Sequence, residues 1–411
     1  MPTSTSRAFV WVWLPGQTQP VPAGLLRPDQ TGRAWEFAYG RRYLARTDAL
    51  SLSPTLPLGV DVFPATADLG MPGAIRDGAP DNWGRRVILN AHAGKRGRNA
   101  DTDDLDHLTY LLESGSDRLG AIDFQASADE YIPRGERSTL DDLQRAAQLV
   151  DAGEELPDQL AAAVMHGTSL GGAAPKATLV DDDDREYLAK FSTADNYYPV
   201  IKAEAASIDL ARRIGIEVPD ARLTQSLGRD VLLIDRFDRP GDGTRRMVVS
   251  ALTLLDLGES ESRSATYLDL LARLRELGAD AGHALFQRIA FNVAISNTDD
   301  HPRNHAAYWN GHTAALTPAY DLSPMNRSGE TAYQAMAYGP GGERESKLAT
   351  LRAVGSEYGL TSAEAREIIQ GVVDGIEEHW LDAADAARLT SAERNYLWRR
   401  QFLNRGSLYD L

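Results

Sequence analysis

Aromatic residues that recur at every second position predict strands near the start of the chain. Aromatic residues recur at every second position over residues 9–13 and again over residues 35–39, which is the period of a half-buried β-strand. A stretch rich in proline and glycine, residues 57–80, is expected to be mostly loop. Helical spacing follows over residues 81–93 and 138–152. These elements predict a mixed α/β domain at the N-terminal end.

A polar stretch, GEELPDQ, marks a domain boundary, so we assign residues 1–155 to this first domain. Beyond it, residues 156–245 are rich in strand patterns: ATLV, an acidic turn and then YLAKF. In YLAKF we expect Lys190 on the face opposite Tyr187 and Phe191, because successive residues of a strand point to opposite faces. This segment predicts a small β-rich lobe.

Helical spacing dominates the rest of the chain, residues 246–411. Phe286, Ile289 and Val293 form the apolar stripe of an amphipathic helix. A single helix is expected within the β-rich part, at residues 202–214. The order of mixed domain, β-rich lobe and helical lobe predicts an α+β fold. It has the two-lobed arrangement of protein kinases, with an N-terminal mixed α/β domain added.

Composition and charge narrow the possible functions. The chain has 411 residues and no cysteine, which excludes disulfides, thiolate catalysis, iron–sulfur clusters and thiolate zinc sites. Its net charge of −16 makes it a poor binder of nucleic acid, because a phosphate backbone favours clustered Lys and Arg. No apolar run approaches the ~18 residues of a membrane span, and the short aromatic stretch at the start is more typical of a strand than of a signal peptide. We therefore expect a soluble, cytoplasmic protein with no membrane partner.

The segment ISNTDDHPRNHAAYW carries the most informative spacing. Asp299 and Asn304 are five residues apart, as are the Asp and Asn of the kinase catalytic loop. In kinases the Asp orients the attacking hydroxyl and the Asn holds Mg²⁺, so both must approach one phosphate. Asp, Asn and Pro also favour turns, so a loop that only ends a helix explains this segment equally well by itself. Asp321, in LTPAYDLSP, favours the kinase interpretation, because kinases place a second Mg²⁺-binding Asp shortly downstream.

Candidate phosphate-binding residues precede this loop. Kinases use a strand Lys on the phosphates and a Glu from the next helix to hold it, and Lys190 and Glu204 occur in that order. Each of them alone is also compatible with a solvated surface position. The segment GTSLGGAAPKATL has small residues that let a backbone approach phosphates, and Lys176 adds charge to it. It matches neither G-x-G-x-x-G nor G-x-x-x-x-G-K-[ST].

Taken together, these segments resemble the HipA-type serine/threonine kinase toxins of bacterial toxin–antitoxin modules. The motifs SLGGAAPKA, YLAKFS, LIDRFDR, NTDDHPRN and YDLSP occur in the order of that family. The early aromatic strand and the segment DGAPDNWGRR match as well, so the resemblance spans nearly the whole chain.

The resemblance implies a role for each matching residue. It makes Asp299 the catalytic residue, and Asn304 and Asp321 the ligands of Mg²⁺. It also implies that Ser169 is autophosphorylated, which expels its loop and switches the kinase off. The ATP-binding residues that it implies are Gly171, Gly172, Ala173, Ala174, Pro175, Lys176, Lys190, Asp235, Arg236, Phe237, His301, Arg303, Asn304 and Asp321.

Two places depart from the family pattern, and one segment takes a specific role in it. Residues 235–237 occupy the hinge segment that meets the adenine in the family. Ala174 and Pro175 stand where some members carry Gln-Glu, so contacts of the loop differ there. Asp300 stands where some members have Gly, and its carboxylate either perturbs metal binding or points to solvent.

The resemblance implies an ATP- and Mg²⁺-dependent serine/threonine protein kinase that acts as the toxin of a type II toxin–antitoxin module. Its substrate would be a translation component such as an aminoacyl-tRNA synthetase. Its partner would be a HipB-like DNA-binding antitoxin, through which alone it would meet DNA. One alternative is a non-catalytic scaffold that acts as a co-repressor. Another is a metal-dependent hydrolase built on Asp299, Asp300, His301 and His305, although Pro302 disfavours the helix that would align the two histidines.

Overall fold

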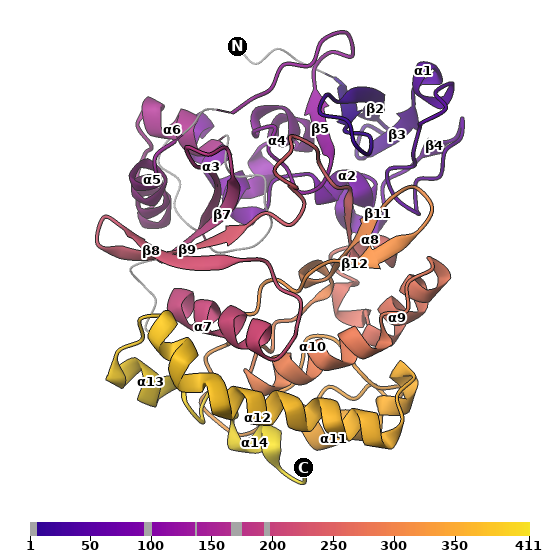
Figure 1. Ribbon diagram of the computed structural model, residues 1–411. Helices are drawn as coiled ribbons and strands as arrows, with labels where there is room; N and C mark the ends of the chain where they lie inside the picture. The colour runs from indigo at the N-terminus through magenta and orange to yellow at the C-terminus, as the bar shows by residue number, and fades with distance from the viewer. Residues whose placement is uncertain (1–5, 94–100, 136–137, 166–174, 193–197) are drawn as a thin grey trace. The chain divides into compact units, whose positions relative to one another are not determined.

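The computed structural model describes residues 6–93, 101–135, 138–165, 175–192 and 198–411 (Figure 1). The chain forms two compact units. The first comprises Met1–Asp195, Thr224–Val249 and Tyr308–His312, and the second Asn196–Leu223, Ser250–Ala307 and Thr313–Leu411. Both units are therefore built from segments that are distant in the sequence.

An antiparallel five-stranded sheet begins the first unit. Its strands, in the order β4-β3-β2-β1-β5, are β1 (Ala8–Val12), β2 (Val21–Pro28), β3 (Trp35–Tyr39), β4 (Val62–Phe63) and β5 (Ile122–Gln125). β1 and β3 confirm the two strands predicted from alternating aromatic residues. The alternation does not predict β2, whose sequence VPAGLLRP contains two prolines and a glycine. Gly24 is needed in β2, because a Cβ there would lie 2.4 Å from the carbonyl oxygen of Ala38 on β3.

Eight short helices and 3₁₀ turns accompany this sheet in the described part of the first unit. They are α1 (Arg41–Leu44), η1 (Ala67–Leu69), α2 (Gly73–Asp77), α3 (Asn82–Ala93), η2 (Thr102–Asp104), α4 (His107–Glu113), α5 (Leu140–Ala152) and α6 (Asp158–Met165). α3 and α5 confirm the helices predicted over residues 81–93 and 138–152. The α5 helix begins where the sequence supplies a cap, since the Thr139 hydroxyl accepts a hydrogen bond from the Asp142 backbone at 3.1 Å.

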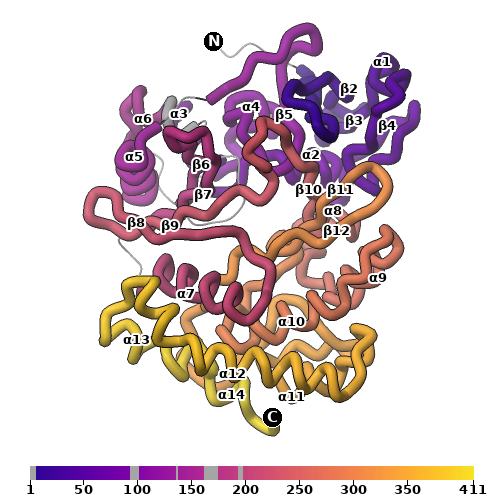
Figure 2. The backbone as a smooth tube through the Cα atoms, in the orientation of Figure 1, coloured from indigo at the N-terminus to yellow at the C-terminus, as the bar shows by residue number. Residues whose placement is uncertain are grey.

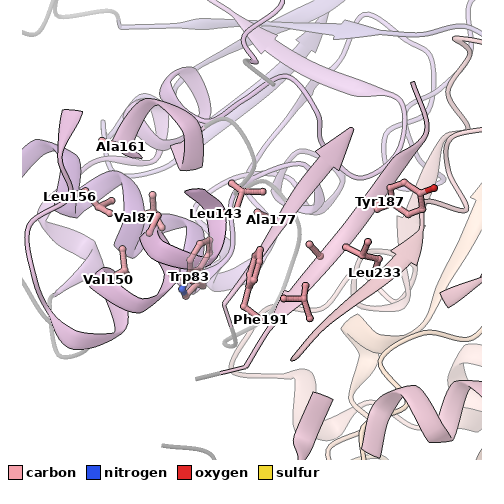
Figure 3. Packing of buried hydrophobic residues seen from close by; sticks show 14 residues of the cluster. Trp83, Val87, Leu143, Val150, Leu156, Ala161, Ala177, Tyr187, Phe191 and Leu233 are labelled. Atoms are coloured by element: carbon pink, nitrogen blue, oxygen red, sulfur yellow. The ribbon is translucent and has the colours of Figure 1, made fainter. Parts of the chain in front are cut away.

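A second sheet packs one of its faces against three of these helices. Its strands, in the order β6-β7-β9-β8, are β6 (Lys176–Val180), β7 (Glu186–Phe191), β8 (Ala221–Ser226) and β9 (Arg229–Asp235). The shared core includes Trp83, Val87, Leu143, Val150 and Leu156 from the helical side, and Ala177, Tyr187, Phe191 and Leu233 from the strands (Figure 3). Lys190 therefore lies on the opposite face, as predicted. Residues before and after position 155 share this core, and the division into domains at 155 and 245 stays a prediction.

The second unit is mainly helical. Its helices and 3₁₀ turns are α7 (Val200–Arg213), α8 (Ala251–Leu254), η3 (Ser262–Ser264), α9 (Tyr267–Glu276), α10 (Gly282–Ala294), η4 (Pro302–Asn304), α11 (Leu348–Ala353), η5 (Gly355–Tyr358), α12 (Ser362–Ala386), α13 (Ser391–Leu397) and α14 (Arg405–Leu408). The long helix α12 packs against α7, α10 and α11 (Figure 2). Capping boxes at Thr361 and Thr390 fix where α12 and α13 begin. Among the described helices, none has the length and apolarity that a membrane span requires.

A small three-stranded sheet receives the segment that the sequence singles out for catalysis, because that segment leads directly into its central strand. It consists of β10 (Val248–Ser250), β11 (Ala306–Trp309) and β12 (Ala314–Leu316), in the order β10-β11-β12. The turn between β11 and β12 contains Gly311, whose φ of +95° is accessible mainly to glycine. The predicted catalytic loop lies between the end of α10 and the start of β11.

Candidate active site

The loop between α10 and β11 brings Asp299 and Asn304 together. The chain leaves α10 through Ser296 and reaches the short 3₁₀ turn η4, which ends at Asn304. The Asn304 side-chain nitrogen donates a hydrogen bond to the backbone oxygen of Asp299 at 3.2 Å. Asp299 is exposed and Asn304 is buried. The bond uses the amide nitrogen of Asn304, so its side-chain oxygen is the atom suited to coordinate a cation.

Asp300 anchors this loop to the helices behind it. Its side chain is only 2% exposed, and one oxygen, Oδ2, accepts hydrogen bonds from the Tyr267 hydroxyl and from the Asn292 amide at 2.7 Å. His305 Nε2 lies 2.9 Å from the same oxygen. Burial and the neighbouring carboxylate raise the pKa of Tyr267 well above its ordinary value, so its hydroxyl remains a donor. The Asp300 carboxylate is buried and does not point to solvent, which was one of the two alternatives that the sequence left open.

The Asp321 segment is held against the end of the same helix. The Asn297 side chain donates to the backbone oxygen of Asp321 at 3.2 Å and to the side chain of Asn292 at 3.1 Å. Both Asp321 and Ser296 have left-handed backbone conformations, with φ of +57° and +58°. Non-glycine residues in this region are uncommon, carry a strain of about 1–3 kcal/mol and concentrate at functional sites. The hydrogen bond from Asn297 holds Asp321 beside the end of α10, from which the loop with Asp299 and Asn304 starts.

Two further predicted residues of the loop, His301 and Arg303, are half-buried. The Arg303 guanidinium forms an ion pair with Glu259, at 2.5 Å, and its backbone oxygen accepts a hydrogen bond from the Tyr320 hydroxyl at 2.7 Å. These contacts hold the outer side of the loop in place. The contact of His301 and Arg303 with a nucleotide stays a prediction.

The donors of this site suit a cation that is completed by phosphate oxygens. Mg²⁺ prefers oxygen ligands and is commonly held by one or two protein groups together with substrate phosphates and water. The Asn304 amide oxygen and the Asp321 carboxylate meet that description. Over the described parts of the chain, no three His, Asp or Glu side chains are grouped closely enough to hold a metal by themselves. The zinc-type cluster of the hydrolase alternative is therefore not formed by these residues, and His305 is hydrogen-bonded to Asp300 instead.

The first unit carries two lysines predicted to bind phosphate. Lys176 on β6 and Lys190 on β7 are direct partners in the antiparallel register, and both are buried. Residues opposite each other on adjacent strands share one face of the sheet, so the structure brings these two lysines together. Pro175 leads into β6, where its backbone oxygen accepts a hydrogen bond from the Phe191 amide at 3.0 Å. Ser169 and residues 171–174 lie outside the described residues.

Both charged side chains of the predicted adenine segment form ion pairs. Arg236 is buried and contacts Asp117 at 3.1 Å and Asp238 at 2.8 Å. Burial opposes its charge, but the two carboxylates raise the pKa of Arg236 above its ordinary value. Asp235 forms an ion pair with Arg185. We therefore expect the backbone of this segment, and not these two side chains, to meet adenine.

The supporting residue Glu204 is buried within α7. This helix belongs to the second unit, whereas Lys190 belongs to the first. Its pairing with Lys190 stays a prediction.

Comparison with known proteins gives matches along most of the chain. Residues 12–125 match the HipA N-terminal domain, and residues 168–380 match the HipA-like C-terminal domain. Toxin YjjJ of Escherichia coli K12 is 28% identical over 187 residues, which span 42% of this chain and 41% of YjjJ. The putative kinase Y4mE of Sinorhizobium fredii is 26% identical over 312 residues, which span 70% of this chain and 71% of Y4mE.

One solved structure establishes the fold. HipA in a complex of the Shewanella oneidensis toxin–antitoxin proteins HipA and HipB with operator DNA superimposes with a TM-score of 0.63 at 18% identity. The superposition covers 97% of this chain and 99% of that one. It confirms the predicted α+β, protein-kinase-like fold with an N-terminal mixed domain.

Proposed function

The chain belongs to the HipA family, and we propose that it is a protein kinase that transfers the γ-phosphoryl group of ATP to a serine or threonine hydroxyl. The observation that carries the proposal is the geometry around the end of α10. Asp299 and Asn304 share one hydrogen-bonded loop, and Asn297 fixes Asp321 beside the same helix end. A loop that only ends a helix needs neither the buried Asp300 anchor nor the strained backbone of Asp321.

Each residue has a defined task in the proposed reaction. Asp299 is exposed, so it reaches the incoming hydroxyl, orients it and accepts its proton. The side-chain oxygens of Asn304 and Asp321 would hold Mg²⁺, which would neutralise charge on the β- and γ-phosphates. Lys176 and Lys190 bind phosphate oxygens. Catalysis then depends mainly on positioning and electrostatic stabilisation, for which a rigidly anchored loop is suited.

We further propose that the kinase is the toxin of a type II toxin–antitoxin module. Its similarity to toxin YjjJ and its structural likeness to a HipA solved with HipB and operator DNA support this proposal. A HipB-like antitoxin would carry the DNA contacts, which agrees with the net charge of −16 on this chain. The substrate would be a translation component, with an aminoacyl-tRNA synthetase as the first candidate.

The proposal is tested with purified wild type, Asp299→Asn and a matched surface control, Asp382→Asn. Asp382 is an exposed residue of α12, so the same substitution there removes a charge without touching the loop. We expect Asp299→Asn to lower Mg²⁺-dependent phosphoryl transfer from ATP by about 10²-fold or more, with ATP binding retained. The control should behave as wild type. ATP binding without any transfer by wild type would favour the scaffold alternative, and equal transfer by both variants would refute the assignment of Asp299.

A further inference from the structure

Two buried lysines lie opposite each other on adjacent strands of the second sheet. Lys176 and Lys190 are direct cross-strand partners, with exposed fractions of only 5% and 7%. Like charges directly opposite each other destabilise a sheet, and burying an ammonium group is costly unless it is paired. This arrangement therefore requires negative charge nearby, both before and after a phosphate group binds.

Asp81, just before α3, supplies that charge from the N-terminal part of the chain. Its oxygen Oδ1 accepts a hydrogen bond from the Gly84 backbone at 2.6 Å and so caps the helix. Its other oxygen, Oδ2, is buried and lies 3.9 Å from the Lys176 ammonium nitrogen. Among the described residues, Oδ2 accepts no hydrogen bond. One oxygen thus serves the helix and the other faces the lysine.

We propose that Asp81 is a positioning residue for the phosphate-binding lysines: its carboxylate holds Lys176 opposite Lys190 and thereby sets the affinity for ATP. The inference rests on the proposed kinase function. It assigns a role in nucleotide binding to a residue outside the strand, loop and hinge segments that resemble a kinase. The carboxylate acts through Lys176, because it offsets the repulsion between the two ammonium groups.

The same contact makes ATP binding sensitive to pH near neutrality. The charged groups that face Asp81 are Lys176 on β6, Arg76 on α2 and Arg86 on α3. Burial outweighs their attraction and raises the pKa of Asp81 to about 7. The carboxylate is therefore ionised above pH 7 and holds Lys176. Below pH 7 the carboxylate takes up a proton and no longer holds Lys176. ATP affinity should fall as pH falls through this range.

The test measures binding of ATP with Mg²⁺ by calorimetry at pH 6 and pH 8, together with kcat and KM. Asp81→Asn removes the charge but keeps the helix cap, because Asn is an equally good capping residue. Asp81→Ser is a second capping variant with a smaller side chain. Asp106→Asn is the matched control, since Asp106 is an exposed cap of α4 that accepts a hydrogen bond from the Thr109 backbone at 3.0 Å.

At pH 8 we expect Asp81→Asn and Asp81→Ser to bind ATP about five- to tenfold more weakly, with kcat nearly unchanged at saturating ATP. At pH 6 the gap to wild type should close. Ionisation of ATP itself affects all proteins equally and cancels in this comparison. A difference in ATP affinity between wild type and the variants that does not depend on pH would overturn the proposal. Tighter binding by both variants would also overturn it, because it would show that Asp81 competes with phosphate for Lys176. Wild type that binds no ATP would instead refute the proposed kinase function itself.

Discussion

Asp81 should make the stability of the wild-type fold depend on pH between about 4 and 7, and Asp81→Asn should remove that dependence. Burial raises the pKa of Asp81 from its ordinary 3.8 to about 7. Between these values the folded protein keeps a proton that the unfolded chain has released, so stability decreases as pH rises from about 4 to 7 and then levels off. At pH 8 the difference in pKa corresponds to a cost of about 4 kcal/mol, and at pH 5 to less than half of that.

The effect of Asp81 is measured by comparing the unfolding free energies of wild type and Asp81→Asn at two pH values. Asp81→Asn should gain about 3 kcal/mol of unfolding free energy over wild type on going from pH 5 to pH 8, and effects of the substitution that do not depend on pH cancel. Urea denaturation of both proteins at the two pH values provides the assay, with matching m-values as a check that the same surface unfolds. The exposed cap variant Asp106→Asn should show a small difference that does not change with pH. If the gap between Asp81→Asn and wild type is the same at both pH values, Asp81 does not titrate near neutrality and our reasoning about its burial is wrong.

Three further predictions concern the loop and the lysines. Asp300→Asn should destabilise the second unit by about 3–5 kcal/mol in urea denaturation and also lower kcat, because three polar groups lose a buried charged partner. Tyr267→Phe should cost only about 1 kcal/mol. Equal stability of Asp300→Asn and wild type would contradict the anchoring role of Asp300. Lys190→Ala should raise the KM for ATP in steady-state kinetics, and a double-mutant cycle with Glu204→Ala should give non-additive effects if the two pair. Peptide mass spectrometry after incubation with ATP and Mg²⁺ should find phosphate on Ser169, together with loss of activity; phosphate only at other positions would exclude self-inactivation there.

Periodic patterns in the sequence predicted those strands that are determined by their own residues. Aromatic residues at every second position are enough to predict β1 and β3, because a period of two is the repeat of side chains on one face of a strand. The same rule fails for β2, where prolines and Gly24 indicate a loop. The fold needs the glycine for the close approach of β3, a contact that only the tertiary structure reveals.

The candidate site also contains some features that local sequence predicts and others that depend on the tertiary structure. The spacing of Asp299 and Asn304 is local, so the sequence brings them into one loop without knowledge of the fold. The anchoring role of Asp300 was not predictable, because two of its partners come from the separate helices α9 and α10. Asp81 and Lys176 are likewise far apart in the chain, and no spacing rule connects them. What the sequence lacks in each case is the long-range packing that buries a charge and selects its partner.

Phosphoproteomics after brief expression of wild type and Asp299→Asn in bacterial cells asks whether this loop transfers phosphate to protein hydroxyls. We expect new phosphoserine or phosphothreonine sites in cells with wild type, including a site on a translation component, and none of them with Asp299→Asn at equal protein levels. Identical phosphoproteomes from the two strains, with both proteins folded and abundant, would contradict this expectation.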